Sequence, residues 1–250
     1  MKHLIISDES IQNKTLVLSQ NQAHHLLAVC KCKANDILSA ATPTAHYQIK
    51  ITKLSAKQLH FQILSEEKRK KSQLPIFHLI QALPKQDKFA EICRSCTEIG
   101  VDTIRPILSQ RCDIKAKKTQ HKYQRWERII ESAALQSKRD HIPQLHSVQT
   151  MSEMLKNLKE EKTLKLIFWE EAQYNQLPYA LLEKVQTNKT VFNDVIILIG
   201  PEGGFDKKET SACVSAGFHC LSLGKNILRV EHAGFAALNH IITYLNYLRY

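Results

Sequence analysis

Short apolar runs alternate with helical patterns through most of the chain after residue 73. The apolar runs are short and bounded by turn residues, as buried strands are. They cover residues 76–82, 102–108, 164–169, 195–199 and 219–223. Helices are predicted between and after them at 89–99, 118–138, 177–185, 206–217 and 230–248. This alternation predicts an α/β fold with a mainly parallel sheet that helices cover on both faces.

The first 72 residues follow a different pattern, rich in predicted strands. Residues 59–63 alternate apolar and polar positions, as a half-buried strand does, and 2–6 and 46–54 are further strand candidates. One short helix is predicted at 22–31, with Asn21 as its cap.

Eight polar or charged residues in a row, 66–73, separate the two patterns. Such a run is typical of a solvated loop or of a domain linker, and the change of pattern favours a linker. We therefore expect two domains, a small β-rich one at 1–72 and an α/β one at 73–250.

Glycine is scarce in the chain and gathers after two of the predicted strands. None of the seven glycines lies in the first 99 residues, and three fall in one loop, at Gly200, Gly203 and Gly204. Gly224 follows the next apolar run. Glycine is useful where main chain turns sharply or approaches a ligand closely, and ligands of open α/β sheets bind beyond the carboxyl ends of the strands. The two loops are therefore candidates for one binding site.

Motif spacing limits what the first loop binds. A phosphate-binding P-loop ends in Gly-Lys-Ser/Thr, whereas this loop ends in Gly-Gly-Phe, and the spacing G-x-x-G-G also differs from the dinucleotide fingerprint G-x-G-x-x-G. Two interpretations remain: a small adenine-containing ligand held by main chain, with Glu202 as the only charge, and a purely structural turn. A second glycine loop after a neighbouring strand favours the ligand.

Composition also predicts which class of molecule the protein binds and in which cell compartment it acts. The formal net charge of +11 favours a polyanion such as nucleic acid, although a basic surface without nucleic acid has the same composition. No apolar stretch reaches the length of a membrane span, and the N-terminal apolar run is too short for a signal peptide, so we expect a cytoplasmic protein.

The seven cysteines are expected to be reduced thiols. Only Cys93 and Cys96 have the spacing of a metal-binding pair, and they fall in a helical pattern. No metal is therefore expected.

Several motifs together resemble the ribosomal small subunit methyltransferase E family, the 16S rRNA uridine N3-methyltransferases of the SPOUT superfamily. The strongest likeness is Gly-Pro-Glu-Gly-Gly-Phe at 200–205, followed by Leu-Gly-x-x-Ile-Leu-Arg at 223–229. Three weaker likenesses extend the resemblance over nearly the whole chain. They are the segments 87–101, 136–143 and 24–29.

The resemblance implies a fold, a cofactor and partners. Residues 1–72 would be a PUA-like β-barrel that helps to hold RNA, and 73–250 a SPOUT domain with a C-terminal trefoil knot. The family methylates uridine N3 with S-adenosyl-L-methionine as the methyl donor, acts on the small ribosomal subunit, and pairs as a homodimer through the C-terminal domain. The cofactor-binding candidates are Ile199, Gly200, Pro201, Glu202, Gly203, Gly204, Leu223, Gly224, Asn226, Ile227 and Leu228.

The catalytic candidates and two RNA-binding candidates, Gln136 and Arg139, follow from the same resemblance, and a basic stretch adds three further RNA-binding candidates. Arg229 is expected to hold a phosphate or to stabilise a developing uridine anion, or instead to pair with Glu98 or Glu231. The catalytic candidates are Arg229, Glu98 and Arg139, and no general base is assigned. The RNA-binding candidates are Gln136, Arg139, Arg111, Lys122 and Arg125. The last three lie in the basic stretch 111–128, which contains Tyr123 and Trp126 and suits either RNA contact or a solvated helix face.

The chain departs from the family pattern at Cys30 or Lys31, Leu135, Asn226 and His232. These departures concern the RNA side more than the glycine loops. Two other functions therefore stay open: a non-catalytic RNA-binding or ribosome assembly factor on the same fold, and a SPOUT methyltransferase with another RNA target.

Overall fold

The computed structural model describes residues 3–69, 74–112, 120–158, 162–172 and 192–247. The chain divides into two compact units. The N-terminal unit contains Met1–Lys71 together with Glu131–Ile142, and the C-terminal unit contains Ser72–Ile130 and Pro143–Tyr250. The segment Glu131–Ile142 thus belongs to the N-terminal unit although it is distant in sequence.

The N-terminal unit is built on a five-stranded sheet in the order β1-β3-β4-β5-β2. β1 pairs with β3 in parallel, and the other neighbours are antiparallel. Alternate residues of β4, among them Ile49 and Ile51, are fully buried, and they pack with Leu4, Leu38 and Leu59. The strands are β1 (His3–Ile5), β2 (Thr15–Val17), β3 (Ile37–Ala41), β4 (Ala45–Leu54) and β5 (Gln58–Lys68).

Two predictions for this unit were wrong in detail. The helix predicted at 22–31 begins earlier, as α2 (Gln20–His24), and continues as the π-helix η1 (His25–Val29). Ser19, not Asn21, caps α2, because Ser19 and Gln22 form a reciprocal capping box.

The polar run at 66–73 begins as a strand, since β5 extends to Lys68; residues 70–73 lie outside the described residues. A short helix α1 (Asp8–Gln12) was not predicted.

The C-terminal unit contains a seven-stranded sheet whose order is β12-β10-β11-β6-β7-β8, with β9 also pairing with β7. Every pairing in it is parallel, which confirms the predicted α/β class. Its strands are β6 (Ile76–Ala82), β7 (Thr103–Leu108), β8 (Gln144–Leu145), β9 (Gln149–Thr150), β10 (Thr163–Phe168), β11 (Asp194–Ile199) and β12 (His219–Leu221).

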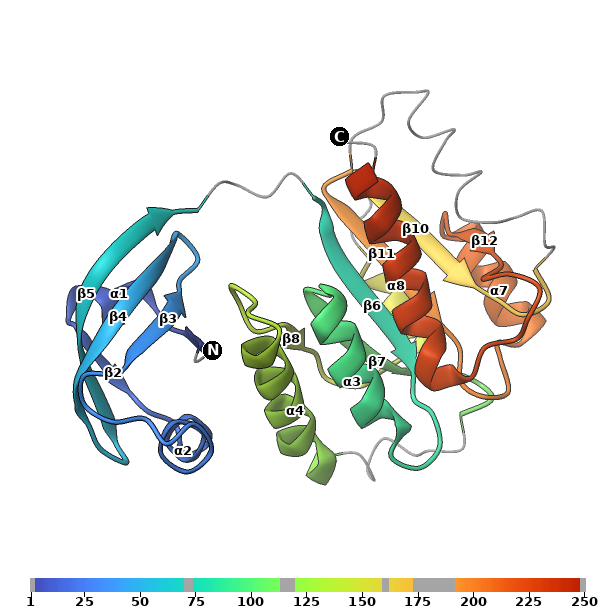
Figure 1. Ribbon diagram of the computed structural model, residues 1–250. Coiled ribbons are helices and arrows are strands. Elements are labelled where there is room, and N and C mark those ends of the chain that lie inside the picture. The colour runs from blue at the N-terminus through green and yellow to red at the C-terminus, as the bar shows by residue number, and fades with distance from the viewer. Residues whose placement is uncertain (1–2, 70–73, 113–119, 159–161, 173–191, 248–250) are drawn as a thin grey trace. The chain divides into compact units, whose positions relative to one another are not determined.

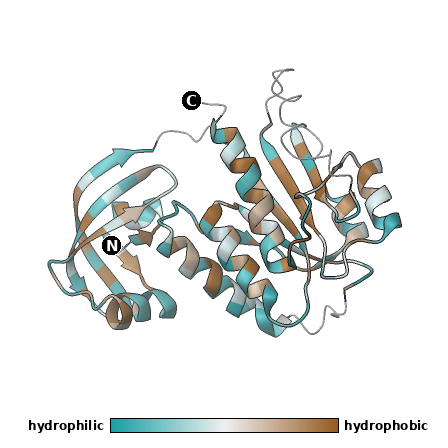
Figure 2. Ribbon diagram, turned by 45° about the vertical axis from the view of Figure 1, so that its right-hand side comes forward, coloured by the Kyte–Doolittle hydropathy of each residue, from teal (hydrophilic) through white to brown (hydrophobic). Residues whose placement is uncertain are grey.

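Helices cover both faces of this sheet (Figures 1 and 2). On one face, alternate strand residues such as Leu79 and Ile197 pack against α3 (Lys88–Ile99) and α8 (Val230–Tyr247). On the other, Ile80 and Leu198 pack with residues of α5 (Met151–Lys156) and α7 (Lys207–Ser215). Because both faces are buried, the strands are mostly apolar rather than alternating, with a few polar residues such as Gln81 and Lys165.

The helix ends follow local rules. Gly100 terminates α3 in the left-handed conformation, and Asp206 caps α7 in a capping box with Glu209, as the sequence predicts. Within the helix predicted at 118–138, residues 118–119 lie outside the described residues, 120–136 form η3 (Gln120–Lys122) and α4 (Tyr123–Gln136), and 137–138 form a turn. The helix predicted at 177–185 also lies outside the described residues. No helix in the described ranges combines the length and apolar character needed to cross a membrane.

The end of α4 has the geometry of a Schellman motif. Arg139 N–H donates to the Ala134 carbonyl at 2.9 Å, and Lys138 N–H donates to that of Leu135 at 3.3 Å. Lys138 has φ +56°, a conformation in which most motifs of this kind carry glycine. The turn after α4 is therefore set by main-chain bonds in spite of an unfavourable residue.

Lys138→Gly is expected to stabilise the protein by roughly 0.5–1 kcal/mol, because glycine removes the left-handed strain. Urea unfolding measures this change, with Lys138→Ala as the control that removes the side chain but keeps the strain. A glycine variant no more stable than the alanine variant would contradict the assignment.

Candidate functional site

A cavity of about 630 Å³ lies in the C-terminal unit, and three neighbouring strands lead into it. The loops after β10, β11 and β12 line it, together with the first turns of α3 and α8. Parallel strands bring their carboxyl ends to one edge of a sheet, which is where ligands of such sheets bind. The cavity volume is in the range of small-molecule and cofactor sites.

The structure brings both predicted glycine loops to this cavity. All eleven cofactor-binding candidates line it: Ile199, Gly200, Pro201, Glu202, Gly203, Gly204, Leu223, Gly224, Asn226, Ile227 and Leu228. Lys88, Glu170, Lys225, Arg229 and Glu231 line it as well. Glu202 is therefore not its only charged residue, contrary to the expectation from the loop sequence alone.

Gly204 and Gly224 have backbone conformations that favour glycine, with φ of +65° and +125°. A Cβ at Gly204 would overlap the carboxylate of Glu170, which lies directly over this glycine. At Gly203, in contrast, φ is not positive, and a Cβ would make ordinary contacts with Arg111 at 3.6 Å. Gly204 is thus the glycine of the loop that tolerates a side chain least.

The first glycine loop is held by hydrogen bonds within its own main chain and from two polar side chains. Gly204 N–H donates to the Pro201 carbonyl at 3.0 Å, which closes a tight turn. Gln81, fully buried on β6, donates through Nε2 to the Gly200 carbonyl at 3.1 Å. Arg111 donates to the Gly203 carbonyl at 2.7 Å. These three hydrogen bonds fix the loop backbone without any ligand.

Lys88 joins the loop to two helices. Its ammonium lies 3.0 Å from Glu202 Oε1 and 3.6 Å from Glu231 Oε2. Both oxygens of Glu202 also accept the backbone N–H of Lys85 at 3.1 Å. Glu202 is the carboxylate of the glycine loop, Lys88 begins α3, and Glu231 lies in the first turn of α8, so one cation ties together three walls of the cavity.

The electrostatics of this cluster favour its charged form. The hydrogen bond that Lys88 donates to Glu202 raises the pKa of Lys88. The pKa of Glu231 is lowered, first by its own backbone N–H at the start of α8 and further by Lys88. Negative charge is favourable in the first turn of a helix for the same reason. The contribution of Glu231 to stability is present above its unfolded pKa and is lost as the pH falls through the lower folded value.

The three catalytic candidates are not brought together at the cavity. Arg229 lines it with an exposed side chain, and its carbonyl accepts the N–H of His232 at 2.9 Å at the start of α8. Glu98 is exposed near the end of α3 and is not among the lining residues. Arg139 belongs to the N-terminal unit, where it donates to His141 Nε2 at 3.1 Å.

The remaining RNA-binding candidates have varied surroundings. Lys122 donates to the Gln86 carbonyl at 3.4 Å, and Arg125 forms an ion pair with Asp87. Gln136 is exposed at the last residue of α4. Arg111 is committed to the glycine loop and also lies 3.8 Å from Asp206.

The aromatic residues of the basic stretch are structural. Trp126 is buried and packs edge-on against Phe89, with ring centroids 4.5 Å apart, and Tyr123 donates to the His146 carbonyl at 2.7 Å. Residues 113–119 of that stretch lie outside the described residues. The side chains of Tyr123 and Trp126 are thus engaged in packing rather than presented to a partner.

The cysteines are free thiols, in agreement with the sequence prediction. Cys93 and Cys96 are fully buried in the core between the sheet and α3, and burial raises the pKa of Cys96 to about 12. A thiol that stays protonated is a poor metal ligand. Within the described ranges, no group of three or more histidine, cysteine or acidic residues is arranged to hold a metal ion.

Sequence comparison relates the chain to a known class of protein. Residues 70–242 match the RNA methyltransferase domain family. The chain is 30% identical to the ribosomal RNA small subunit methyltransferase E of Synechocystis over 242 residues, which are 95% of this chain and 76% of that protein. It is 29% identical to the protein of the same name from Buchnera aphidicola of Schizaphis graminum, over 90% of this chain and 89% of that one.

Solved structures agree with this relationship. A putative methyltransferase from Legionella pneumophila, solved with bound SAM, is 27% identical, with a TM-score of 0.75 over 92% of both chains. The ribosomal RNA small subunit methyltransferase E of Neisseria gonorrhoeae, at 24% identity and a TM-score of 0.78 over 98% of both chains, has the same fold. Because residues 70–242 match this domain family, the chain is an RNA methyltransferase. It belongs to the ribosomal RNA small subunit methyltransferase E family.

Sequence reasoning missed several residues of the site. Lys88 was noted within a family-like segment but not as a lining residue, and Gln81 and Glu170 were not identified. Gln81 and His78 are the two polar residues in the otherwise apolar run 76–82. A polar residue near the carboxyl end of a buried strand is a signal that could have identified Gln81 as a site residue. Glu170 follows β10 directly, the position at which site residues of such sheets occur.

Lys88→Met is expected to lower the free energy of unfolding at pH 7, and by more than the loss of a surface ion pair, because two carboxylates lose their shared cation. The difference from the wild type should narrow as the pH falls through the lowered folded-state pKa of Glu231, where its carboxylate becomes protonated. Urea unfolding from neutral pH down through that acidic range measures both effects.

The control is Lys207→Met, since Lys207 pairs with Glu171 at 3.5 Å but its side chain is 77% exposed. We expect a change below about 0.5 kcal/mol for this surface pair. An equal, pH-independent loss in both variants would contradict the bridging role of Lys88.

Proposed function

We propose that the chain transfers a methyl group from S-adenosylmethionine to N3 of a uridine in the 16S rRNA of the small ribosomal subunit. The observation that carries the proposal is the cavity that both glycine loops line at the carboxyl edge of a parallel sheet. The names of the relatives point to a small-subunit rRNA substrate, and the Legionella structure contains SAM. The protein would act in the cytoplasm, where ribosomal subunits are assembled.

The residues present fit this methyl donor. The cavity is large enough for a cofactor, and the two glycine loops expose main chain to it. The lining combines carboxylates with the cations Lys88, Lys225 and Arg229, which suits a ligand that carries both signs of charge. We assign binding to residues 199–204 and 222–228. The bound donor supplies an activated methyl group on a sulfonium, so the protein has mainly to position the reactants.

Lys88, Glu202 and Glu231 would serve this reaction by holding the walls of the cavity. Both carboxylates lie within ion-pair distance of Lys88, and the lowered pKa of Glu231 makes that carboxylate a weak proton acceptor. Their proposed role is therefore to position the loops rather than to move a proton.

Arg229 would act on the RNA side of the cavity. The imide proton of uridine N3 must leave before or during methyl transfer, which places negative charge on the base. A guanidinium cannot accept that proton, but it stabilises the anion or holds an adjacent phosphate. Arg229 lines the cavity and is exposed, so it is accessible to an incoming nucleotide. The base has to be unpaired or flipped to reach it.

RNA binding would extend over both proposed domains. We propose residues 1–72 as a PUA-like RNA-binding barrel and 73–250 as a SPOUT methyltransferase domain with a C-terminal trefoil knot. The net charge of +11 supports a polyanionic partner. The proposed RNA contacts are Gln136, Arg139, Arg111, Lys122 and Arg125, with Glu98 and Arg139 as further candidates for the reaction.

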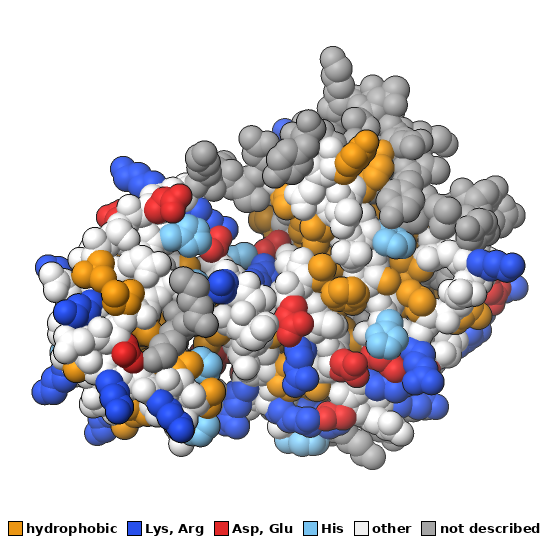
Figure 3. Space-filling model, viewed as in Figure 1, with side chains coloured by type: hydrophobic (Ala, Val, Ile, Leu, Met, Phe, Trp, Pro, Cys, Tyr) orange, Lys and Arg blue, Asp and Glu red, His pale blue; other side chains and the backbone are white. Residues whose placement is uncertain are grey.

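A homodimer is proposed through α8 of the C-terminal domain. Hydrophobic side chains gather on the face that carries α8 (Figure 3). Phe235 is 38% exposed and Tyr247 is 77% exposed, and Ile227 of the neighbouring loop is 82% exposed. Exposed apolar residues that cluster on one face mark interaction sites. A second copy of the chain covering them would bring the cavity loops near the interface.

Gly204→Ala is expected to weaken S-adenosylmethionine binding at least about tenfold, because the left-handed backbone strains any side chain by roughly 1–2 kcal/mol and Glu170 is displaced. Gly203→Ala is the matched control, and its affinity should stay within about twofold, since its backbone and its surroundings accept a Cβ. Isothermal titration calorimetry measures both. Equal affinities in the two variants would contradict the proposed cradle.

Methyl transfer itself is tested with isotopically labelled S-adenosylmethionine and small ribosomal subunits. The expected product is labelled 3-methyluridine, detected by nucleoside mass spectrometry, and Arg229→Ala should lower its rate at least about tenfold while cofactor affinity changes little. Cofactor binding without any methylated nucleoside would favour a non-catalytic assembly factor. Label in another nucleoside or another RNA would indicate a different RNA target.

A further inference from the structure

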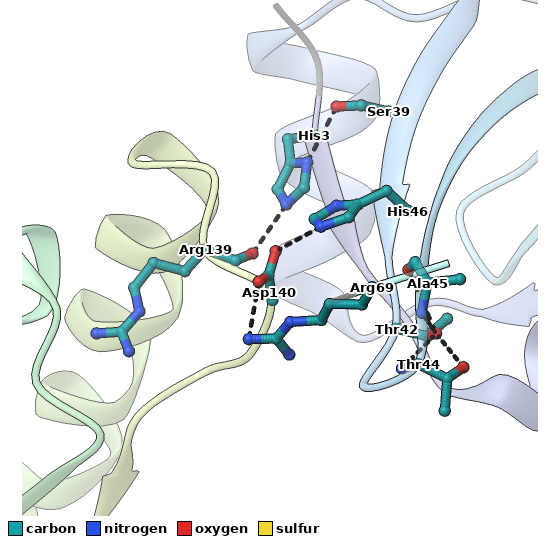
Figure 4. A network of polar contacts seen from close by, with 9 residues as sticks. All are labelled: His3, Ser39, Thr42, Thr44, Ala45, His46, Arg69, Arg139 and Asp140. Atoms are coloured by element: carbon teal, nitrogen blue, oxygen red, sulfur yellow. Dashed lines mark hydrogen bonds and ion pairs between the residues drawn. The ribbon is translucent and has the colours of Figure 1, made fainter. Parts of the chain in front are cut away.

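The segment that carries Arg139 is fastened to the N-terminal sheet by a polar network (Figure 4). Asp140 is at its centre: Oδ2 lies 2.9 Å from Arg69 Nη2, and Oδ1 lies 3.4 Å from His46 Nε2. His46 belongs to β4, and Arg69 follows the end of β5. The two oxygens of one carboxylate thus contact a residue of β4 and the residue that follows β5.

A buried histidine adds a second attachment. His3 is 6% exposed, and its Nε2 lies 2.9 Å from the Arg139 carbonyl. Because a carbonyl only accepts, Nε2 carries the hydrogen. The other ring nitrogen, Nδ1, lies 3.0 Å from Ser39 Oγ on β3. The backbone of Arg139 is therefore held by β1 and β3, and its neighbour Asp140 by β4 and β5.

The conformation of the segment is also fixed from its helical side. The Schellman bonds described above join Lys138 and Arg139 to the last turn of α4. The main chain of Arg139 is thus held on both sides. The side chain of Arg139 points away from the strands in Figure 4, and its guanidinium binds His141.

We infer that Asp140 is a positioning residue for RNA binding, which aims the guanidinium of Arg139 at an RNA phosphate. The inference rests on the proposed function, in which Arg139 contacts the RNA. A pre-organised arginine loses less conformational freedom on binding than a mobile one. The contacts of Asp140 therefore contribute to RNA affinity although Asp140 does not touch the RNA.

A double-mutant cycle with Asp140→Asn and Arg139→Ala tests this inference. Dissociation constants are measured by fluorescence anisotropy on a labelled transcript of small-subunit rRNA. We expect Asp140→Asn to weaken RNA binding roughly fivefold to tenfold in the wild-type background. In the Arg139→Ala background it should weaken binding by less than about twofold, because Asp140 acts only through Arg139. Losses that multiply in the double variant would overturn the role of Asp140.

Two further variants separate positioning from folding and from total charge. Glu67→Gln removes one negative charge at a residue that pairs with His46 across the sheet, and it should leave RNA affinity within about twofold. Asp140→Arg combined with Arg69→Asp restores the ion pair in reverse and should recover most of the affinity lost in Asp140→Asn. Failure of the exchange to recover affinity would contradict positioning by this pair.

Cofactor binding distinguishes failure of this inference from failure of the proposed function. S-adenosylmethionine affinity, measured by calorimetry, should be the same in the wild type and in all five variants of the N-terminal unit. A wild type that binds neither S-adenosylmethionine nor the transcript would overturn the proposed function and this inference with it. Multiplying losses in a chain that binds both would overturn the inference alone.

Discussion

Burial of the parallel sheet on both faces is the constraint from which the site follows. Helices on each face leave only the ends of the strands open, and parallel strands all end at the same edge. The loops after β10, β11 and β12 therefore meet there, and so do the first turns of α3 and α8. Glycine allows one of these loops to turn within a few residues, and Lys88 compensates the two carboxylates that meet between them. The cavity is thus a consequence of topology, refined by a few polar contacts.

The parts of the fold that local rules determine could be predicted from the sequence. The strand at 76–82, the end of α3 at Gly100 and the capping box at Asp206 all depend on residues within a few positions of one another. The glycine loops were identified because glycine is rare elsewhere in the chain. Ser19 rather than Asn21 caps α2 because both residues are good caps, and the reciprocal bond with Gln22 decides between them.

The contacts that could not be predicted join residues far apart in sequence. Lys88 and Glu231 are separated by most of the C-terminal unit, and neither has a local pattern that indicates the other. The return of Glu131–Ile142 to the N-terminal unit is a similar case, since its partners His3, His46 and Arg69 come from three different parts of the first 69 residues. Trp126 lies in a basic stretch whose pattern suits either RNA contact or a solvated helix face, but tertiary packing against Phe89 places its side chain in the core.

The central claim is that the two glycine loops form one cofactor cradle, and hydrogen–deuterium exchange with and without S-adenosylmethionine tests it most directly. The account predicts slower exchange in the amides of 200–204 and of 222–229 together, with no change in β1 to β5 of the N-terminal unit. Protection of one loop without the other, or of neither at a saturating concentration of S-adenosylmethionine, would contradict it.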